Sequence, residues 1–362
     1  MLTRARFWRR CRRTIPPQSG SRNPSRVRAR GNKQWPPMPD ILAIQFSDYG
    51  SADVLQAKRI PAPVPAAGEV LIDVYAGSIN PIDWKIRSGM LKGVFPAKLP
   101  MITGRDGAGV ISAVGEGVDP ARVGERICFL AARGVGAWAE QIVLPAPLAV
   151  KIPDSLSFTD AAALPLAGLS AWAALVTAAG IGPGTRVLIH AAAGGVGTLA
   201  VQIARARGAE VFATCSARNA DYVRALGANV VIPYDTEKFE NRVSGLDVVF
   251  DTMGGDVHRR SYAVLRKGGT LVCLSAEPYE DRGTEYGVSV KMAQVLPDPQ
   301  ALAALLALVE AGRLKPVVEH VLPFSDFAAA HRLSEQGHAR GKTVIAIRPA
   351  ATQPRATAAA HG

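Results

Sequence analysis

The segment from Val187 to Gly197 constrains this chain more than any other, and it reads Val-Leu-Ile-His-Ala-Ala-Ala-Gly-Gly-Val-Gly. Its apolar start predicts a buried strand, its small residues predict a tight turn, and the periodic residues up to Arg207 predict a helix. A strand, turn and helix of this kind are typical of dinucleotide binding. Small residues let the backbone approach a pyrophosphate, and the helix N-terminus offers it free N–H groups.

The match to the pattern Gly-x-Gly-x-x-Gly is imperfect, because Ala192 occupies the first glycine position. The context strengthens it, since a second strand is predicted at Glu210–Thr214, directly after the helix. The alternative is an ordinary tight turn between a strand and a helix. The expected pyrophosphate contacts are Ala193, Gly194, Gly195, Val196 and Gly197.

The end of that second strand indicates which nucleotide binds. An NAD site usually carries an acidic residue there for the ribose hydroxyls, but residues 214–218 read Thr-Cys-Ser-Ala-Arg. Ser216 can donate to a 2′-phosphate and Arg218 can pair with it. We therefore predict NADPH as the cofactor in preference to NADH. In the alternative interpretation Ser216 caps a helix and Arg218 is a solvated residue of its first turn.

Charge and composition exclude several classes of protein. The net charge is +12, but residues 1–39 carry eleven Lys or Arg and no Asp or Glu. Removing these eleven from 42 leaves 31 basic against 30 acidic residues, so the rest gives no reason to expect nucleic-acid binding. The sequence has no apolar run of about 18 residues, which excludes a transmembrane helix. Its four cysteines are far apart, which argues against a disulfide framework.

Residues 1–39 form a separate unit, rich in Arg and Pro, that we predict to be disordered. It has three competing interpretations: a mitochondrial targeting segment, a basic arm for RNA or anionic lipid, or a start codon placed too far upstream. We favour the third, with Met38 as the true start, because a strand is predicted at Ile41–Phe46. The predicted compartment is the cytoplasm, with the mitochondrion as the alternative. Residues 349–362 are expected to be a disordered tail.

The remaining chain predicts two domains. Residues 40–150 hold short β-type runs bounded by Gly and Pro, which indicates a barrel-like β domain. Thr159–Ala179 is expected to be helical, and strands then alternate with helices, which predicts a parallel sheet covered on both faces. Its later strands are predicted at Val230–Ile232, Asp247–Asp251 and Thr270–Leu274. A helix is expected at Pro299–Glu310, and two further strands near residues 317–322 and 342–347 are expected to return to the first domain.

This layout resembles the zinc-free quinone oxidoreductase branch of the medium-chain dehydrogenase/reductase superfamily, the branch that includes zeta-crystallin. The resemblance rests on four segments: residues 190–197 with Gln202, Asn-Pro-Ile-Asp-Trp-Lys-Ile-Arg-Ser-Gly at 80–89, Gly-Arg-Asp-Gly-Ala-Gly-Val at 104–110, and Gly341-Lys342. It implies an α/β protein with a GroES-like, β-rich catalytic domain and a doubly wound Rossmann domain for NADPH. The implied limits are 40–157 with 315–348 for the first domain and 158–314 for the second. The resemblance also implies a homodimer.

Zinc-dependent relatives hold a catalytic zinc with Cys, His and Cys, and the matching positions here carry Asn80, Arg105 and Leu166. None of these is a usual zinc ligand, so we predict that no metal binds. Without zinc, direct hydride transfer to a quinone or an α,β-unsaturated carbonyl remains accessible, because these acceptors delocalise the charge they receive. An enoyl or alkenal reductase is the alternative within the branch. A catalytically weak NADPH-binding or RNA-binding protein is the alternative from another class.

Asn80 and Lys85 are the candidate catalytic residues. The resemblance places an active-site Asn at Asn80, whose amide can donate to a carbonyl oxygen, although a turn residue before Pro81 explains it equally well. Lys85 stands where many quinone reductases have a Tyr, and its ammonium would stabilise an oxyanion or reach a phosphate. A solvated surface lysine is the alternative for Lys85. No Tyr lies in residues 88–92, so the proton donor stays unassigned.

Further contacts with the cofactor are expected at the carboxyl edge of the sheet, where open α/β folds bind ligands. They are Thr252, Gly254, Leu274 and Ser275 for the nicotinamide half and Tyr234 for the adenine side. Arg105 and Asp106 are expected to form an ion pair, either beside the cleft or at a strand start.

Overall fold

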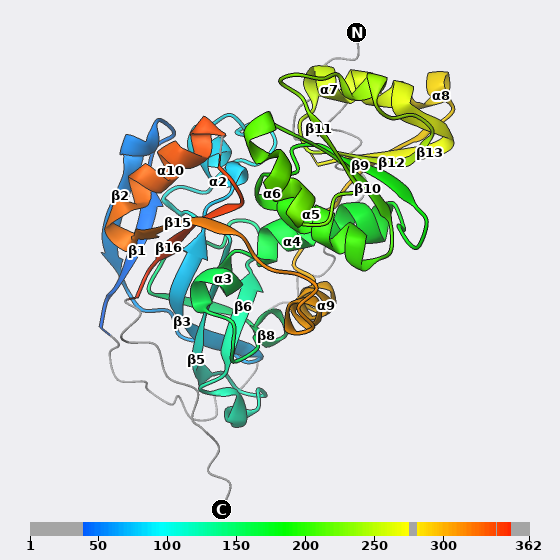
Figure 1. The fold of residues 1–362 in the computed structure, drawn as a ribbon. Coiled ribbons are helices and arrows are strands. Elements are labelled where there is room, and N and C mark those ends of the chain that lie inside the picture. The colour runs from blue at the N-terminus through cyan, green and yellow to red at the C-terminus, as the bar shows by residue number, and fades with distance from the viewer. Residues whose placement is uncertain (1–38, 275–280, 338, 349–362) are drawn as a thin grey trace, which may run out of the picture.

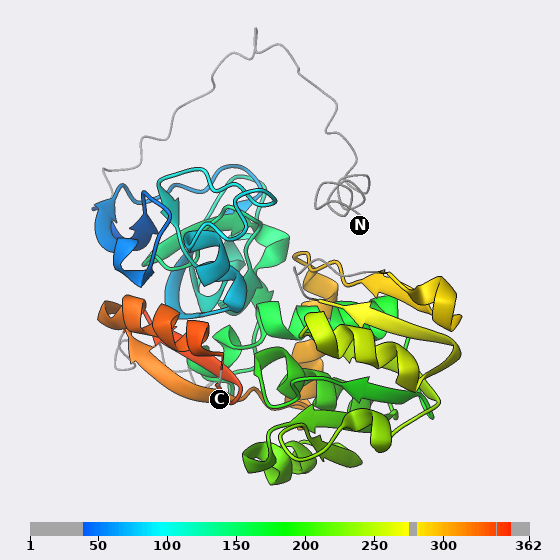
Figure 2. The same ribbon diagram turned by 90° about the horizontal axis from the view of Figure 1, so that it is seen from above.

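The computed structural model describes residues 39–274, 281–337 and 339–348. It confirms the predicted fold class: two lobes with separate β-sheets lie side by side (Figures 1 and 2). The segments predicted to be disordered, residues 1–39 and 349–362, lie outside the described residues apart from Pro39.

The first lobe contains a seven-stranded and a three-stranded sheet. The larger has the order β15-β16-β3-β5-β6-β8, with β7 beside β3, and the smaller has the order β2-β1-β4. The C-terminal strand β16 pairs antiparallel with β3, which brings residues near 344 beside residues near 78 (Figure 1). The strands are β1 (Ile41–Phe46), β2 (Leu55–Ile60), β3 (Glu69–Ser78), β4 (Met101–Ile102), β5 (Asp106–Val114), β6 (Arg126–Leu130), β7 (Gln141–Pro145), β8 (Val150–Lys151), β15 (Val318–Pro323) and β16 (Lys342–Ala346).

The second lobe contains a parallel six-stranded sheet in the order β11-β10-β9-β12-β13-β14. The chain builds outward from β9 in one direction through β10 and β11, and in the other through β12, β13 and β14. The point where the order reverses, between β9 and β12, is where doubly wound sheets bind their ligands. The strands are β9 (Arg186–Ile189), β10 (Glu210–Cys215), β11 (Val230–Pro233), β12 (Leu246–Asp251), β13 (Leu265–Cys273) and β14 (Ser289–Met292). The sequence analysis missed β14, because this edge strand is short and alternates exposed with half-buried residues.

The helix expected over Thr159–Ala179 is divided into three parts. The chain forms α3 (Phe158–Ala162), then α4 (Pro165–Trp172), and continues as a π-helix over Ala173–Ala178. Pro165 begins α4 because a proline, which has no N–H to donate, suits the first helical position. The other helices are α2 (Pro81–Arg87), α5 (Gly195–Ala206), α6 (Ala220–Ala225), α7 (Gly255–Ser261), α8 (Gly283–Tyr286), α9 (Pro299–Glu310) and α10 (Phe327–Gln336).

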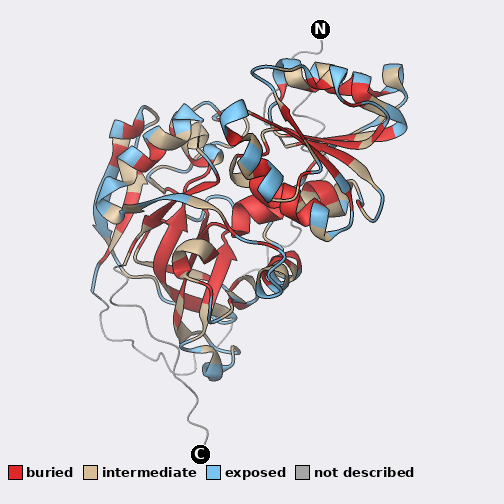
Figure 3. Cartoon of the chain, viewed as in Figure 1, coloured by how far each residue is buried: buried red, intermediate tan, exposed pale blue. Residues whose placement is uncertain are grey.

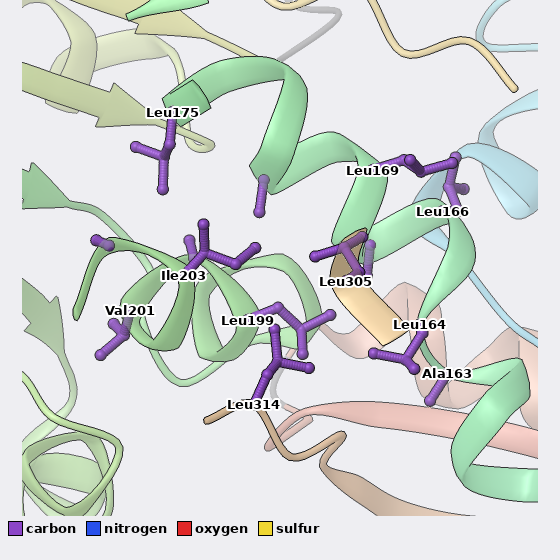
Figure 4. Packing of buried hydrophobic residues seen from close by; sticks show 14 of the residues in the cluster. Ala163, Leu164, Leu166, Leu169, Leu175, Leu199, Val201, Ile203, Leu305 and Leu314 are labelled. Carbon is purple, nitrogen blue, oxygen red and sulfur yellow. The ribbon is translucent and has the colours of Figure 1, made fainter. Parts of the chain in front are cut away.

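Buried residues concentrate in the strands of both lobes and in the helices between them (Figure 3). Helix α4 packs against α5 and α9, and Leu199 of α5 and Leu305 of α9 are buried beside it (Figure 4). Gly168 of α4 permits this approach, because an added Cβ would lie 2.8 Å from Leu305 Cδ1. This cluster extends into both sheets and so holds the two lobes together. Among the described residues, no helix is long and apolar enough to cross a bilayer.

Candidate functional site

The small-residue turn between β9 and α5 has the geometry of a pyrophosphate site. Gly194 caps α5 in an extended conformation and contributes no side chain, so the N–H groups of the first helical turn have no side-chain partner at the cap. Gly197 lies against the turn itself, since an added Cβ would come within 2.2 Å of the Ala191 carbonyl oxygen. Ala193, Gly195 and Val196 complete the same turn. The partial positive charge of the helix N-terminus therefore lies at a turn built from small residues.

After the end of β10, Arg218 and Asn219 line a pocket of about 260 Å³, and Ser216 lies next to them in the chain. Arg218 is exposed and lines the pocket, whereas Ser216 accepts a hydrogen bond from the Asn219 amide at 3.1 Å. Ser216 does not cap the following turn with its side chain, unlike in the alternative interpretation. Arg340 and His320 line the same pocket and add positive or titratable groups to it.

The sequence analysis missed Arg340, which comes from the far end of the chain. Its guanidinium donates twice to the Asn219 carboxamide oxygen, at 3.2 and 3.0 Å, and lies 4.9 Å from the centre of the Tyr222 ring. Two acids also lie here: Asp235 accepts from the Ala217 N–H at 2.9 Å, and Glu319 accepts from the Arg340 N–H. The only sequence signal for Arg340 was its position directly before Gly341-Lys342.

The residues expected beside the nicotinamide converge at the switch point. Thr252 donates to the His190 carbonyl oxygen at 3.2 Å, and Leu274 donates its N–H to the Asp251 carbonyl at 2.9 Å. Gly254 has a φ of 75°, and its N–H donates to the Asp251 carboxylate. Ser275 lies outside the described residues. Tyr234, which was expected on the adenine side, is 60% exposed and follows β11, and its N–H donates to the Cys215 carbonyl oxygen.

Asn80 lies at the start of α2, a helix that the sequence analysis did not predict. Its side chain is buried and both of its polar atoms are engaged. The amide nitrogen donates to Asp106 Oδ1 at 2.9 Å, and the amide oxygen accepts from Lys342 Nζ at 2.6 Å. Lys85 is half-buried on the same helix, with its ammonium 5.6 Å from the centre of the Trp84 ring.

The expected ion pair between Arg105 and Asp106 is wrong. Arg105 donates instead to the Ala131 carbonyl oxygen at 3.1 Å. Asp106 accepts from Ser78 at 2.8 Å, from Asn80, and from the Leu166 N–H at 3.0 Å. Arg105 immediately precedes β5, and the two adjacent side chains have separate partners.

These contacts bring together the three positions that correspond to zinc ligands in zinc-dependent relatives. Asn80 and Leu166 both donate to the Asp106 carboxylate, and Arg105 precedes it in the chain. The cluster instead holds four buried ionisable groups, Asp83, Arg105, Asp106 and Lys342. Its chemistry is therefore that of a hydrogen-bonded charge network.

Burial, and then repulsion from Asp106, raise the pKa of Asp83 from its usual 3.8 to about 7. The folded chain therefore binds this proton more tightly than the unfolded chain, and the resulting stabilisation disappears as the pH rises from about 4 to 7. In Asp83→Asn nothing ionises, and the amide oxygen can still accept from the Asn80 N–H as the carboxylate does. We compare the free energy of unfolding of the variant with that of the wild type. We expect this difference to favour the variant by about 2 kcal/mol or more at pH 8 relative to pH 5.

Urea denaturation at both pH values measures this difference. The control is Asp48→Asn, which removes an exposed carboxylate outside the buried network. If the relative stability of both variants changed equally between pH 5 and pH 8, the raised pKa of Asp83 would be contradicted.

The fold and the site together define an oxidoreductase that uses a nicotinamide cofactor. A family model for the alcohol dehydrogenase GroES-like domain matches residues 66–154, and one for zinc-binding dehydrogenases matches residues 226–345. The chloroplast envelope quinone oxidoreductase homolog of Arabidopsis thaliana is 34% identical over 322 residues, which cover 84% of this chain and 97% of that protein. The chain therefore belongs to the medium-chain dehydrogenase/reductase superfamily, in its quinone oxidoreductase-like branch.

Two other similar proteins represent different activities and ligands. The 2-methylene-furan-3-one reductase of Solanum lycopersicum is 32% identical over 318 residues, which cover 84% of this chain and 79% of that protein. A mycobacterial protein solved in complex with NADPH is 31% identical, with a TM-score of 0.77, over 84% of this chain and all of that one.

Proposed function

We propose that this protein is an NADPH-dependent reductase that transfers hydride, without zinc, to a quinone or to an activated C=C or carbonyl acceptor. The observation that carries the proposal is the glycine turn at the switch point of the sheet, with a basic pocket at the end of the neighbouring strand. The quinone oxidoreductase and enone reductase names of the relatives support the acceptor class.

Preference for NADPH rests on the pocket beside Ser216. Arg218 and Arg340 offer guanidinium groups there, and a guanidinium matches the geometry of phosphate oxygens. The stacking of Arg340 on Tyr222 and its bonds to Asn219 hold it in a fixed orientation, which lowers the entropy lost on binding. The mycobacterial relative bound to NADPH agrees with this assignment.

Zinc independence rests on the donor set. Zinc in a catalytic site needs three thiolate, imidazole or carboxylate ligands. The three matching positions supply a carboxamide, a guanidinium and an alkyl side chain, so they do not fit the metal. The buried positive charge of Arg105 further disfavours a cation there. We therefore assign the stabilisation of negative charge on the acceptor to protein groups and not to a metal.

When it is bound, the cofactor supplies hydride from its nicotinamide ring. The chain contributes position and electrostatics. Thr252, Gly254 and Leu274 form the edge against which the ring would lie, and the network around Asn80 forms a buried polar surface on the opposite lobe. Asn80 has both amide atoms engaged, so we assign it the role of ordering this surface, and Lys85 keeps the predicted role of meeting negative charge.

Turnover of an acceptor panel tests the reaction class. NADPH oxidation is followed with 1,4-benzoquinone, 9,10-phenanthrenequinone, an alkenal and a crotonyl thioester. Quinone turnover supports the proposal as stated. Turnover of the alkenal or thioester alone moves the assignment to the enoyl or alkenal reductase, and NADPH binding without turnover moves it to a nucleotide-binding protein.

Replacing Arg340 tests the cofactor preference. Loss of a charge-assisted hydrogen bond to phosphate costs about 1.5–3 kcal/mol, so Arg340→Gln should weaken NADPH binding about tenfold or more and leave NADH binding unchanged. Fluorescence titration with both nucleotides measures this, with the exposed Arg59→Gln in the other lobe as control. Equal weakening of both nucleotides would contradict a phosphate-reading role.

Three predictions concern the setting of the enzyme. We propose a homodimer joined through the nucleotide-binding domains, with small-molecule substrates and neither nucleic acid nor membrane as partners. We propose the cytoplasm as the compartment, with the mitochondrion as the alternative. We also propose the domain limits given above, 40–157 with 315–348 and 158–314.

A further inference from the structure

Lys342 opens β16 and has no role in the function proposed so far, although Gly341-Lys342 carried part of the family resemblance. The side chain is 5% exposed, and its ammonium donates to the Ile79 carbonyl oxygen at 2.8 Å and to Asn80 Oδ1 at 2.6 Å. A buried ammonium with two such acceptors fixes the orientation of the Asn80 carboxamide. Its oxygen faces Lys342, so its nitrogen faces Asp106.

The same two residues contact the nucleotide-binding turn. The Gly341 N–H donates to the Ala193 carbonyl oxygen at 2.9 Å, and Gly341 forms a parallel bridge with Gly194. The aliphatic stem of Lys342 lies against Gly195, where an added Cβ would come within 2.7 Å of Lys342 Cδ. One end of this side chain therefore touches the turn, and the other end holds Asn80.

The charges around the ammonium explain why it can be buried. Asp106 and Asp83 both attract it, and Arg105 lies near the same two carboxylates. Burial lowers the pKa of Lys342, and these carboxylates oppose that shift. In turn, burial raises the pKa of Asp106, and Lys342 is the largest influence that lowers it. The network therefore depends on the ammonium for its charge balance as well as for its geometry.

We propose that Lys342 is a positioning residue that joins the nucleotide-binding turn to the Asn80–Asp106 network, so that cofactor binding and the ordering of the acceptor side are coupled through one side chain. The proposal rests on the proposed function. Because both contacts lie on a single side chain, displacement of the stem at Gly195 also displaces the ammonium at Asn80.

The first test separates the charge from the stem. Lys342→Met keeps an aliphatic stem beside Gly195 but removes the ammonium. We expect kcat to fall at least about tenfold, with NADPH affinity changed less than about threefold. The acid limb of the pH profile of kcat/KM should also move to higher pH, because Asp106 loses the charge that lowers its pKa. Lys342→Arg should restore part of kcat and bring the acid limb of the pH profile back toward its wild-type position. An unchanged pH profile with kcat and affinity reduced together would overturn the proposal.

The second test uses the contact with Gly195 and leaves all charges in place, so it stands even if Lys342→Met does not fold. Gly195→Ala should push the Lys342 stem away and lower kcat at least about tenfold. Gly182→Ala, in the loop before β9 and outside the nucleotide-binding turn, should not, because its added Cβ would meet no atom within 4 Å. Equal effects of the two alanines on kcat would overturn the proposal.

If the wild type shows no turnover, the proposed function fails but the coupling can still be measured. Thermal unfolding of Gly195→Ala, Lys342→Ala and the double variant gives a mutant cycle. Lys342→Ala removes the clashing stem, so the double variant should be more stable than the two single losses predict. The same cycle with Gly194→Ala should be additive. Additivity in both cycles would overturn the proposal.

Discussion

Gly197→Ala should remove most of the nucleotide affinity of this protein and lower its free energy of unfolding by about 3 kcal/mol. The added methyl group would lie 2.2 Å from the Ala191 carbonyl oxygen and 2.6 Å from Ala192 Cα. Both are backbone atoms of the turn and have no rotamer by which to withdraw. Relief therefore requires α5 to move away from β9, which carries the helix N-terminus away from the pyrophosphate.

Urea denaturation and fluorescence titration with NADPH measure the two effects of Gly197→Ala. Gly194→Ala is the matched control for stability. It adds the same methyl group in the same turn at a φ of −79°, which any residue adopts, and with only an ordinary contact. We expect it to change the free energy of unfolding by less than about 1 kcal/mol. Similar losses of stability in the two variants would show that the close contact at Gly197 is not the reason why this position requires a glycine.

Asp251→Ala should destabilise the nucleotide-binding lobe by about 3 kcal/mol or more, because three donors, two of them on buried residues, lose their acceptor. The fully buried carboxylate accepts from the N–H groups of Met253 and Gly254, at 2.8 and 3.0 Å, and lies 2.9 Å from His258 Nδ1. These bonds hold the loop expected beside the nicotinamide, so nucleotide affinity should fall as well. Cys273 lies beside the same nitrogen, with its sulfur 3.6 Å from His258 Nδ1, but a thiol is a weaker acceptor than the carboxylate.

Asp251→Asn is the comparison for this variant. Its amide oxygen can still accept from both N–H groups, so thermal unfolding at neutral pH should show a loss well below that of the alanine. Burial by itself raises the pKa of Asp251, but the bonds from His258, Gly254 and Met253 outweigh it and leave the pKa lowered. The stabilisation is therefore present at neutral pH and is lost as the pH falls through this lowered value. An alanine variant that is as stable as the asparagine variant would contradict this account.

The nucleotide-binding half was predictable because its signals are local. The strand, turn and helix at residues 186–206 lie in one continuous stretch, and the strands at 210–215, 230–233 and 246–251 agree with the sequence pattern to within about one residue. Burial on both faces makes such strands uniformly apolar, so they are visible without an alignment. The division of the 159–179 helix was less visible, because every part of it is apolar and helical in composition.

The acceptor side was predictable only in outline. Asn80 was identified, but its partners Asp106 and Lys342 lie 26 and 262 residues away, and nothing local predicts a hydrogen bond across such separations. The hydrogen bond between Arg340 and Asn219 could not be predicted for the same reason. It depends on the return of the last strand to the first lobe. The expected pairing of Arg105 with Asp106 was wrong because it assumed that residues adjacent in sequence also contact each other through their side chains.

NADPH oxidation with 9,10-phenanthrenequinone, measured by absorbance before and after treatment with a zinc chelator, tests the central claim most directly. The account predicts turnover that the chelator does not change and that is far slower when NADH replaces NADPH. Turnover abolished by the chelator and restored by added zinc would contradict the claim that this protein reduces its acceptor without a metal.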